Sequence, residues 1–132
     1  MSNYDSEILV LVLPLPPTLN NFYGLTAPTA HRVIKYVKPA GKIFKKDVKD
    51  YIDQNNFNIG ANIPLKVEVI LNFSTNRRQD LDNRLKGLLD SLTEANVFAD
   101  DSLIYDLHII RGTTKKPGGC IVKISEYQEW YY

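Results

Sequence analysis

The sequence predicts a single domain of the α+β class, and three observations lead to this prediction. Apolar and polar residues alternate from Leu65 to Ser74, which is typical of a strand with one buried face. Leucines recur at helical spacing from Leu85 to Leu92, which is typical of an amphipathic helix. The 132 residues show no internal repeat, and their patterns follow the order strand, strand, helix, strand, helix, strand, strand. Residues 1–132 are therefore expected to form one domain, with 127–132 as a tail that is either flexible or packed on a second chain.

The first half of the chain predicts two strands and a helix. Residues 7–14 read as a strand, because a short aliphatic run ends at a proline. Residues 16–24 are expected to be extended or turn-like, since prolines disfavour a helix there, and residues 26–30 are expected to form a loop. Residues 32–37 favour a short strand. From Pro39 onward, apolar residues at helical spacing predict an amphipathic helix with its lysines on other faces.

The second half predicts a further helix and three strands. The strand at 65–74 is followed by a polar turn, and the next helix begins at Asp80 or Asp82. A loop over 98–102 follows this helix. Residues 103–112 and 120–125 then predict two strands joined by a Lys-Lys-Pro-Gly-Gly hairpin turn.

Cysteine content and hydropathy exclude three classes of protein. Cys120 is the only cysteine, so the chain can form neither an internal disulfide nor a cysteine-rich zinc site, and a reducing cytoplasm is expected. The longest apolar run, residues 8–13, is far shorter than the about 20 residues that cross a bilayer. Neither a membrane segment nor a signal peptide is expected.

Charge is distributed unevenly although the net charge is only +1. The stretch 31–49 is basic, and acidic residues predominate from Asp80 to Asp106. A basic surface beside an acidic cluster favours a protein that binds nucleic acid through its cationic side chains and a metal ion through its carboxylates. The alternative is an ordinary solvated surface. The basic residues of this stretch are Arg32, Lys35, Lys38, Lys42, Lys45, Lys46 and Lys49.

Three aspartates are the candidate metal ligands. Asp80 and Asp82 would point the same way if the backbone between them is extended, and Asp101 follows the helix after a loop. Gathered carboxylates raise one another's pKa unless a cation lies among them, and oxygen ligands without His or Cys favour Mg²⁺ or Mn²⁺. The alternative is that Asp80 or Asp82 caps the helix and that Asp101 lies in a turn.

Lys86 is the candidate basic group of the same site. It follows Asp82 by four residues, so its ammonium could lie beside the carboxylates and stabilise charge on a phosphate. The alternative is an ordinary ion pair on an exposed helix face, and Asp90 is expected to be a salt-bridge partner or a solvated residue. His31 and His108 fit no motif of nucleophilic catalysis.

Several motifs recur together in one known family. They are Leu13-Pro14-Leu15-Pro16-Pro17 with Asn20, Asn21 and Tyr23, then Arg77-Arg78-Gln79-Asp80-Leu81-Asp82-Asn83 with Lys86, and Leu89-Asp90-Ser91-Leu92-Thr93 leading to Asp100-Asp101. With these motifs the chain resembles the RusA family of phage and bacterial Holliday-junction resolvases. The resemblance implies a small mixed β-sheet with two main α-helices packed on it. The stretch 26–37 is longer than the family pattern, and the tail 130–132 has no counterpart in it.

The resemblance also implies an activity. It implies a homodimeric, Mg²⁺- or Mn²⁺-dependent endonuclease that cuts four-way DNA junctions by paired symmetrical nicks, in a bacterial cytoplasm and of phage or prophage origin. Asp80, Asp82 and Asp101 correspond to the catalytic metal-binding carboxylates, Lys86 corresponds to the essential basic residue, and Asp100 is their neighbour. The alternatives are a junction-binding protein without catalysis and a nuclease that acts on other branched or single-stranded DNA.

DNA would be held by basic side chains outside the carboxylate site. The expected contacts to phosphates are those of Arg77, Arg78, Lys42, Lys45, Lys46 and Lys49. The alternative for the lysines is a solvated helix face. The aromatic residues Phe22, Tyr23 and Tyr36 could stack on bases at an open junction or pack in the core.

Overall fold

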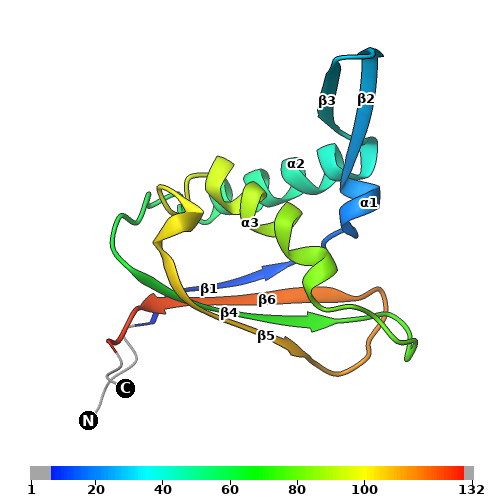
Figure 1. The fold of residues 1–132 in the computed structure, drawn as a ribbon. Coiled ribbons are helices and arrows are strands. Elements are labelled where there is room, and N and C mark those ends of the chain that lie inside the picture. The colour runs from blue at the N-terminus through cyan, green and yellow to red at the C-terminus, as the bar shows by residue number, and fades with distance from the viewer. Residues whose placement is uncertain (1–6, 130–132) are drawn as a thin grey trace.

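Four strands form the central sheet, in the order β1-β6-β4-β5. The structure is a computed structural model that describes residues 7–129. β4 and β5 are parallel, whereas β6 is antiparallel to both β4 and β1, so the sheet is mixed (Figure 1). The bounds are β1 Glu7–Leu13, β4 Leu65–Asn72, β5 Ile104–Arg111 and β6 Gly119–Glu126.

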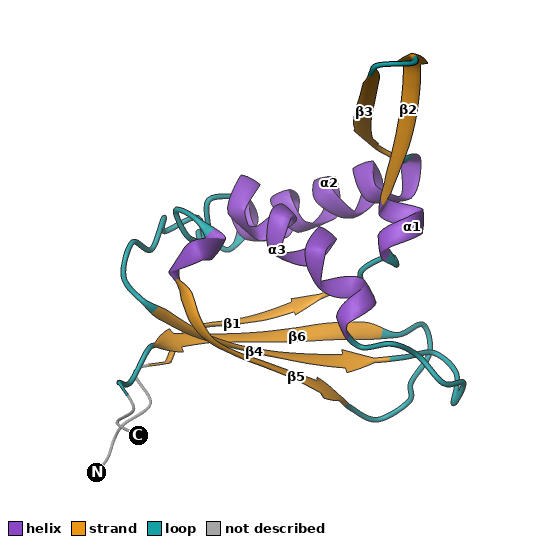
Figure 2. Cartoon of the chain, viewed as in Figure 1, coloured by secondary structure: helices purple, strands orange, loops and turns teal. Residues whose placement is uncertain are grey.

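The helices cover one face of this sheet, and within residues 7–129 no helix lies on its other face (Figure 2). The two long helices are α2, Pro39–Gln54, and α3, Leu85–Glu94. The predicted α+β fold with two main helices is therefore confirmed. Among residues 7–129, no helix is long and apolar enough to cross a membrane. Two short 3₁₀ turns frame α3, namely η1 Asp82–Arg84 and η2 Asp101–Leu103.

The segment predicted as extended and looped forms a short helix and a strand. α1 is Leu19–Phe22, and β2, Tyr23–Thr29, pairs with β3, Arg32–Val37, in a hairpin that projects away from the sheet (Figure 1). The prolines precede α1, so they interrupt none of its hydrogen bonds. Pro28 lies where the register of the hairpin shifts, between Thr26 and Thr29, so its missing N–H costs no regular ladder bond.

The predicted hairpin between the last two strands is wrong. β5 and β6 do not pair with each other, because β4 lies between them and pairs with both. The connection after β5 passes the end of β4, where Lys115 N donates to Phe73 O at 2.9 Å. The chain bends at Lys116 and Pro117 before β6 begins, but such a motif specifies a change of direction and not the neighbour of the next strand.

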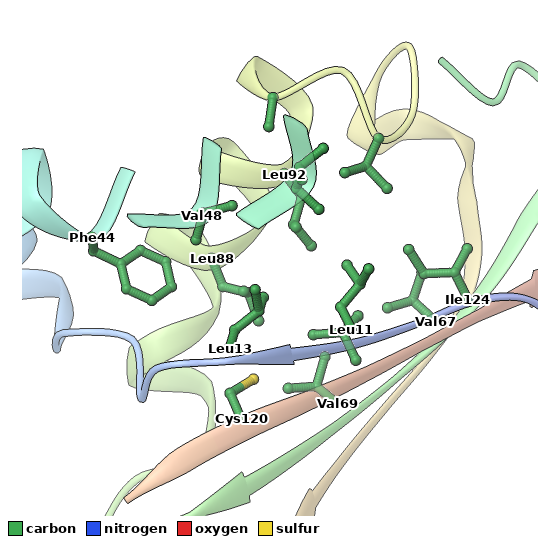
Figure 3. Close-up of a cluster of buried hydrophobic side chains, with 14 of the residues drawn as sticks. Leu11, Leu13, Phe44, Val48, Val67, Val69, Leu88, Leu92, Cys120 and Ile124 are labelled. Atoms are coloured by element: carbon green, nitrogen blue, oxygen red, sulfur yellow. The ribbon is translucent and has the colours of Figure 1, made fainter. Parts of the chain in front are cut away.

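The core lies between the helices and the sheet (Figure 3). The predicted alternation of β4 is confirmed, since Leu65, Val67, Val69 and Leu71 are buried. α2 contributes Phe44, Val48 and Ile52, and α3 contributes Leu88 and Leu92. At the C-terminal end, Tyr127 N donates to Pro64 O, and the predicted tail residues 130–132 lie outside the described part of the chain.

Candidate functional site

Asp80 and Asp82 lie where the chain leaves the sheet and enters α3. Both side chains are exposed, and neither forms a hydrogen bond or an ion pair with residues 7–129. The capping alternative is wrong, because η1 and α3 begin without a side-chain cap. Leu81 has φ −63° and ψ −44°, so helical backbone already begins between the two aspartates. The expectation that an extended backbone points both carboxylates the same way is therefore wrong.

Arg84 anchors this segment to the residues that follow β1 and β4. Its Nη1 donates to Pro16 O at 2.6 Å and its Nη2 donates to Gln79 Oε1 at 3.2 Å. The guanidinium lies 5.3 Å from the centre of the Phe73 ring. Burial lowers the pKa of Arg84. Arg84 was not among the predicted site residues; the signal for it is an arginine that directly follows the Asp-Leu-Asp-Asn run.

Lys86 is paired with Asp90 and not with Asp82. Its Nζ lies 3.1 Å from each carboxylate oxygen of Asp90, and the Tyr23 hydroxyl donates to the same carboxylate. Burial alone would raise the pKa of Asp90, but the Tyr23 hydroxyl and the Lys86 ammonium together lower it. Lys35 lies 3.9 Å above the Tyr23 ring. The expectation that Asp90 is a salt-bridge partner is therefore confirmed, and the base of the projecting hairpin touches the site helix.

Asp100 and Asp101 lie beyond the other end of α3. Asp100 caps η2 by accepting a hydrogen bond from Ser102 N at 2.9 Å, which is the main reason why its pKa is lowered. Asp101 is exposed beside it. The chain therefore brings Asp80 and Asp82 to the start of α3, near Lys86, and places Asp101 at the opposite end of the helix.

The carboxylates are the ligand type that a hard divalent cation prefers, but the three aspartates do not lie close together. Asp80 and Asp82 offer exposed oxygen atoms without a protein partner among residues 7–129. Within the same described range, however, no three His, Cys, Asp or Glu side chains are close enough together to hold one ion. Asp101 does not join the other two within a single chain.

The predicted DNA-binding residues fall into two groups. Arg77 and Arg78 are exposed, and their guanidinium groups form no ion pair within residues 7–129. On α2, by contrast, each of three lysines already faces a carboxylate. The pairs are Lys45 with Glu94, Lys46 with Asp50 at 2.6 Å and Lys49 with Asp53 at 2.6 Å, and Lys42 forms no ion pair in the described part of the chain.

Comparison with known proteins gives one consistent result. Residues 15–125 match the family described as "Endodeoxyribonuclease RusA". The chain is 39% identical over 118 residues to the crossover junction endodeoxyribonuclease of Enterobacteria phage HK97, which covers 89% of this chain and 93% of that protein. It is 28% identical over 116 residues to the crossover junction endodeoxyribonuclease of Escherichia coli, covering 88% and 92% of the two chains.

A protein of Enterobacteria phage 82 with the same name also matches, at 28% identity over 116 residues. The region matched by the family model contains β4, β5, α3 and every aspartate of the candidate site. The chain therefore belongs to the RusA family of endodeoxyribonucleases.

Proposed function

We propose that this chain is a metal-dependent, structure-selective DNA endonuclease that resolves four-way junctions by paired symmetrical nicks. The relatives named as crossover junction endodeoxyribonucleases support the substrate. The observation that carries the proposal is the pair of carboxylates, Asp80 and Asp82, which have no partner among residues 7–129 and lie at the start of α3 with Lys86 one turn further on. Such an exposed acidic pair is available to a cation, and the cation in turn can bind a phosphate.

In the proposed homodimer, Asp80 and Asp82 of one chain would hold Mg²⁺ together with Asp101 of the other chain, with Mn²⁺ as a substitute. A divalent ion supplies an activated water and neutralises charge on the phosphate. Mg²⁺ commonly binds one or two protein carboxylates and completes its shell with water and substrate phosphate. The pair Asp80 and Asp82 therefore needs few further protein ligands.

Lys86 would bind the non-bridging oxygens of the cut phosphate. Its ammonium is half-exposed and is held by both oxygens of Asp90. The Lys86 side chain is therefore already oriented before DNA binds. Arg77 and Arg78 would bind neighbouring phosphates of the backbone, and the lysines of α2 would add weaker contacts. Affinity should therefore fall steeply as salt is added.

The active species is proposed to be a homodimer in the bacterial cytoplasm, encoded by a phage or prophage. A junction has approximate two-fold symmetry, so a two-fold dimer presents one site to each of two opposed strands. The relatives from two phages support the origin. The buried thiol of Cys120, with a pKa raised by burial to about 12, suits a reducing compartment.

The proposal is tested with three labelled substrates: a four-way junction, a fork and a linear duplex. Each is incubated with the protein in Mg²⁺ and in EDTA, beside Asp82→Asn. Paired nicks at symmetrical positions of the junction, lost in EDTA and in the variant, are the expected result. Binding without cleavage would instead indicate a junction-binding module, and cleavage restricted to the fork would indicate another branched substrate.

A further inference from the structure

An open pocket lies at the base of the β2-β3 hairpin, where β2 follows α1. In Figure 1 the hairpin rises from this point away from the sheet. The pocket has a volume of about 230 Å³. Pockets for drug-sized ligands commonly have about 300–1,000 Å³, so this one suits a single small ring system. Its lining residues are Leu19, Asn20, Tyr23, Gly24, Leu25 and Lys35.

The pocket combines an apolar wall with an unused amide. Leu19 is 42% and Leu25 is 71% accessible, so neither side chain is needed to fill the core. The Asn20 side chain forms no hydrogen bond within residues 7–129, whereas its backbone oxygen accepts one from Lys38 Nζ at 2.6 Å. A nucleobase offers apolar faces and a hydrogen-bonding edge, and both features match such a pocket.

Lys35 supplies a positive charge beside this wall. Its Nζ lies 3.9 Å from the centre of the Tyr23 ring, and it forms no ion pair among residues 7–129. Residues 8–46 contain neither Asp nor Glu, so the hairpin has no acidic side chain that competes for the ammonium. A free cation beside an apolar wall favours an anionic ligand with a ring, and a nucleotide of DNA has this composition.

The pocket adjoins the Lys86–Asp90 pair of α3. The Tyr23 hydroxyl donates to Asp90, whose oxygens lie 3.1 Å from Lys86 Nζ. The Tyr23 ring is also packed on buried Phe22, with 4.6 Å between the ring centres. Tyr23 is therefore a fixed wall shared by the pocket and this ion pair. A DNA strand that places its cut phosphate at Lys86 brings a neighbouring nucleotide to the pocket.

We propose that this pocket is a nucleotide subsite that takes one unstacked base close to the cut phosphate. Leu19 and Leu25 contact the base, and Lys35 binds its phosphate. Asn20 forms hydrogen bonds to the edge of the base. The inference rests on the proposed function, which places the cut phosphate at Lys86.

Such a subsite favours branched DNA over a linear duplex. Every base inside a continuous duplex is stacked on both sides and paired. Removing a base from the stack costs least where pairing is already interrupted, as it is at the branch point of a junction. The hairpin would therefore contribute to structure selectivity, and Asn20 would favour some bases at this position over others.

Capture of the base is measured by fluorescence without cleavage. 2-Aminopurine replaces each nucleotide at the branch point in turn, and the protein carries Asp82→Asn so that the DNA stays intact. An unstacked 2-aminopurine is brighter, so a rise of about twofold or more is expected at one branch position and none within the arms. Adding Leu19→Ser and Leu25→Ser should abolish the rise. The matched control is Val33→Ser, which is 67% accessible on the same hairpin and does not line the pocket.

Affinity separates the subsite from general attraction to DNA. Leu19→Ser with Leu25→Ser should weaken junction binding about tenfold, as for loss of contact with one base, and should change duplex binding by less than about twofold. Lys35→Gln should flatten the slope of log affinity against log salt by about 0.9, and Lys35→Arg should restore it. Urea unfolding of each variant checks that the fold is retained, which is expected because the changed side chains are exposed.

Three results would each overturn the inference. They are a junction that is bound without any rise in fluorescence, an equal loss of signal with Val33→Ser, and an equal loss of affinity for the linear duplex. The fluorescence and affinity measurements need no cleavage. A wild-type protein that binds the junction but does not cut it would therefore count against the proposed function alone, and one that binds no junction would overturn both.

Discussion

Gly87 of α3 lies directly against the ring of Phe22. A Cβ atom at position 87 would stand within 2.8 Å of Phe22 Cγ and nearer still to the ring edge. On the other side, a Cβ atom at Gly41 would lie 2.7 Å from Cδ1 of the same ring. Phe22 is therefore held between α2 and α3, and this close approach brings the next residue, Tyr23, within hydrogen-bond reach of Asp90.

Gly87→Ala is expected to destabilise the protein. Alanine normally stabilises a helix relative to glycine by up to about 1 kcal/mol. Here the methyl group would displace Phe22, and overpacking costs about 1–3 kcal/mol, so a net loss is expected. Urea unfolding measures the change. Gly119→Ala is the control, because the nearest atom to its Cβ is 3.5 Å away. A gain in stability at position 87 would contradict the packing.

Asp82→Asn should abolish cleavage without weakening the fold. The side chain is exposed and caps no helix, so its effect on the free energy of unfolding should stay within about 0.5 kcal/mol. Junction binding should be unchanged or tighter, because one repulsive charge near phosphate is removed. Cleavage and gel-shift assays on the same preparation measure both properties. Loss of folding or of all binding would contradict the proposed role of Asp82 in catalysis.

Lys86→Ala should lower the cleavage rate by about 100-fold or more, as for loss of one group that stabilises transition-state charge, with little loss of affinity. Asp90→Asn should lower the rate less. The two changes together should cost no more than Lys86→Ala alone, because Asp90 acts through the lysine. Single-turnover rates give this comparison. Asp106→Asn is the matched control, since Asp90 and Asp106 are both 22% exposed and Asp106 faces His108 Nε2 at 2.9 Å. Additive losses in cleavage rate would show that Asp90 does not act through Lys86.

Stability should depend on pH through Asp90. The folded protein lowers the pKa of this carboxyl below its ordinary 3.8, so the charged form contributes stability above that value and loses it as the pH falls through the folded pKa. The stability difference between wild type and Asp90→Asn should be constant from about pH 5 to 8 and shrink below pH 3.8. Urea unfolding at a series of pH values measures it. If the stability difference between wild type and Asp90→Asn did not shrink at acid pH, the charge of Asp90 would not be its cause.

The salt dependence of junction binding should identify the cationic contacts. Arg77→Ala with Arg78→Ala should flatten the slope of log affinity against log salt by about 0.9 for each arginine. Replacing Lys45, Lys46 and Lys49 together should also weaken binding and flatten the slope, but less per residue, because each lysine leaves a facing carboxylate behind. Fluorescence anisotropy over a salt series measures both slopes. An unchanged slope for either set would remove that surface from the DNA interface.

Local chemistry made several features predictable. The alternation that begins at Leu65 is confirmed as β4, although the strand ends at Asn72 and not at Ser74, and the leucine stripe is confirmed in α3. The spacing of buried side chains follows directly from the period of each element. The family, too, could be recognised from residues that stand close together in the chain, such as the Asp-Leu-Asp-Asn run. These features depend on neighbours a few residues away, so a single sequence contains them.

Long-range placement was decided only by the tertiary structure. β5 pairs with β4 and not with β6, because the β4-α3-β5 unit is parallel and the final strand inserts on the other side of β4. That same crossover places Asp82 and Asp101 at opposite ends of α3, although the sequence motifs suggest that they form one cluster. Packing also adds Tyr23 to the Lys86–Asp90 pair of α3, since Gly87 admits Phe22. Residue types and their spacing specify which chemistry is available, but strand order and helix packing determine which groups can meet.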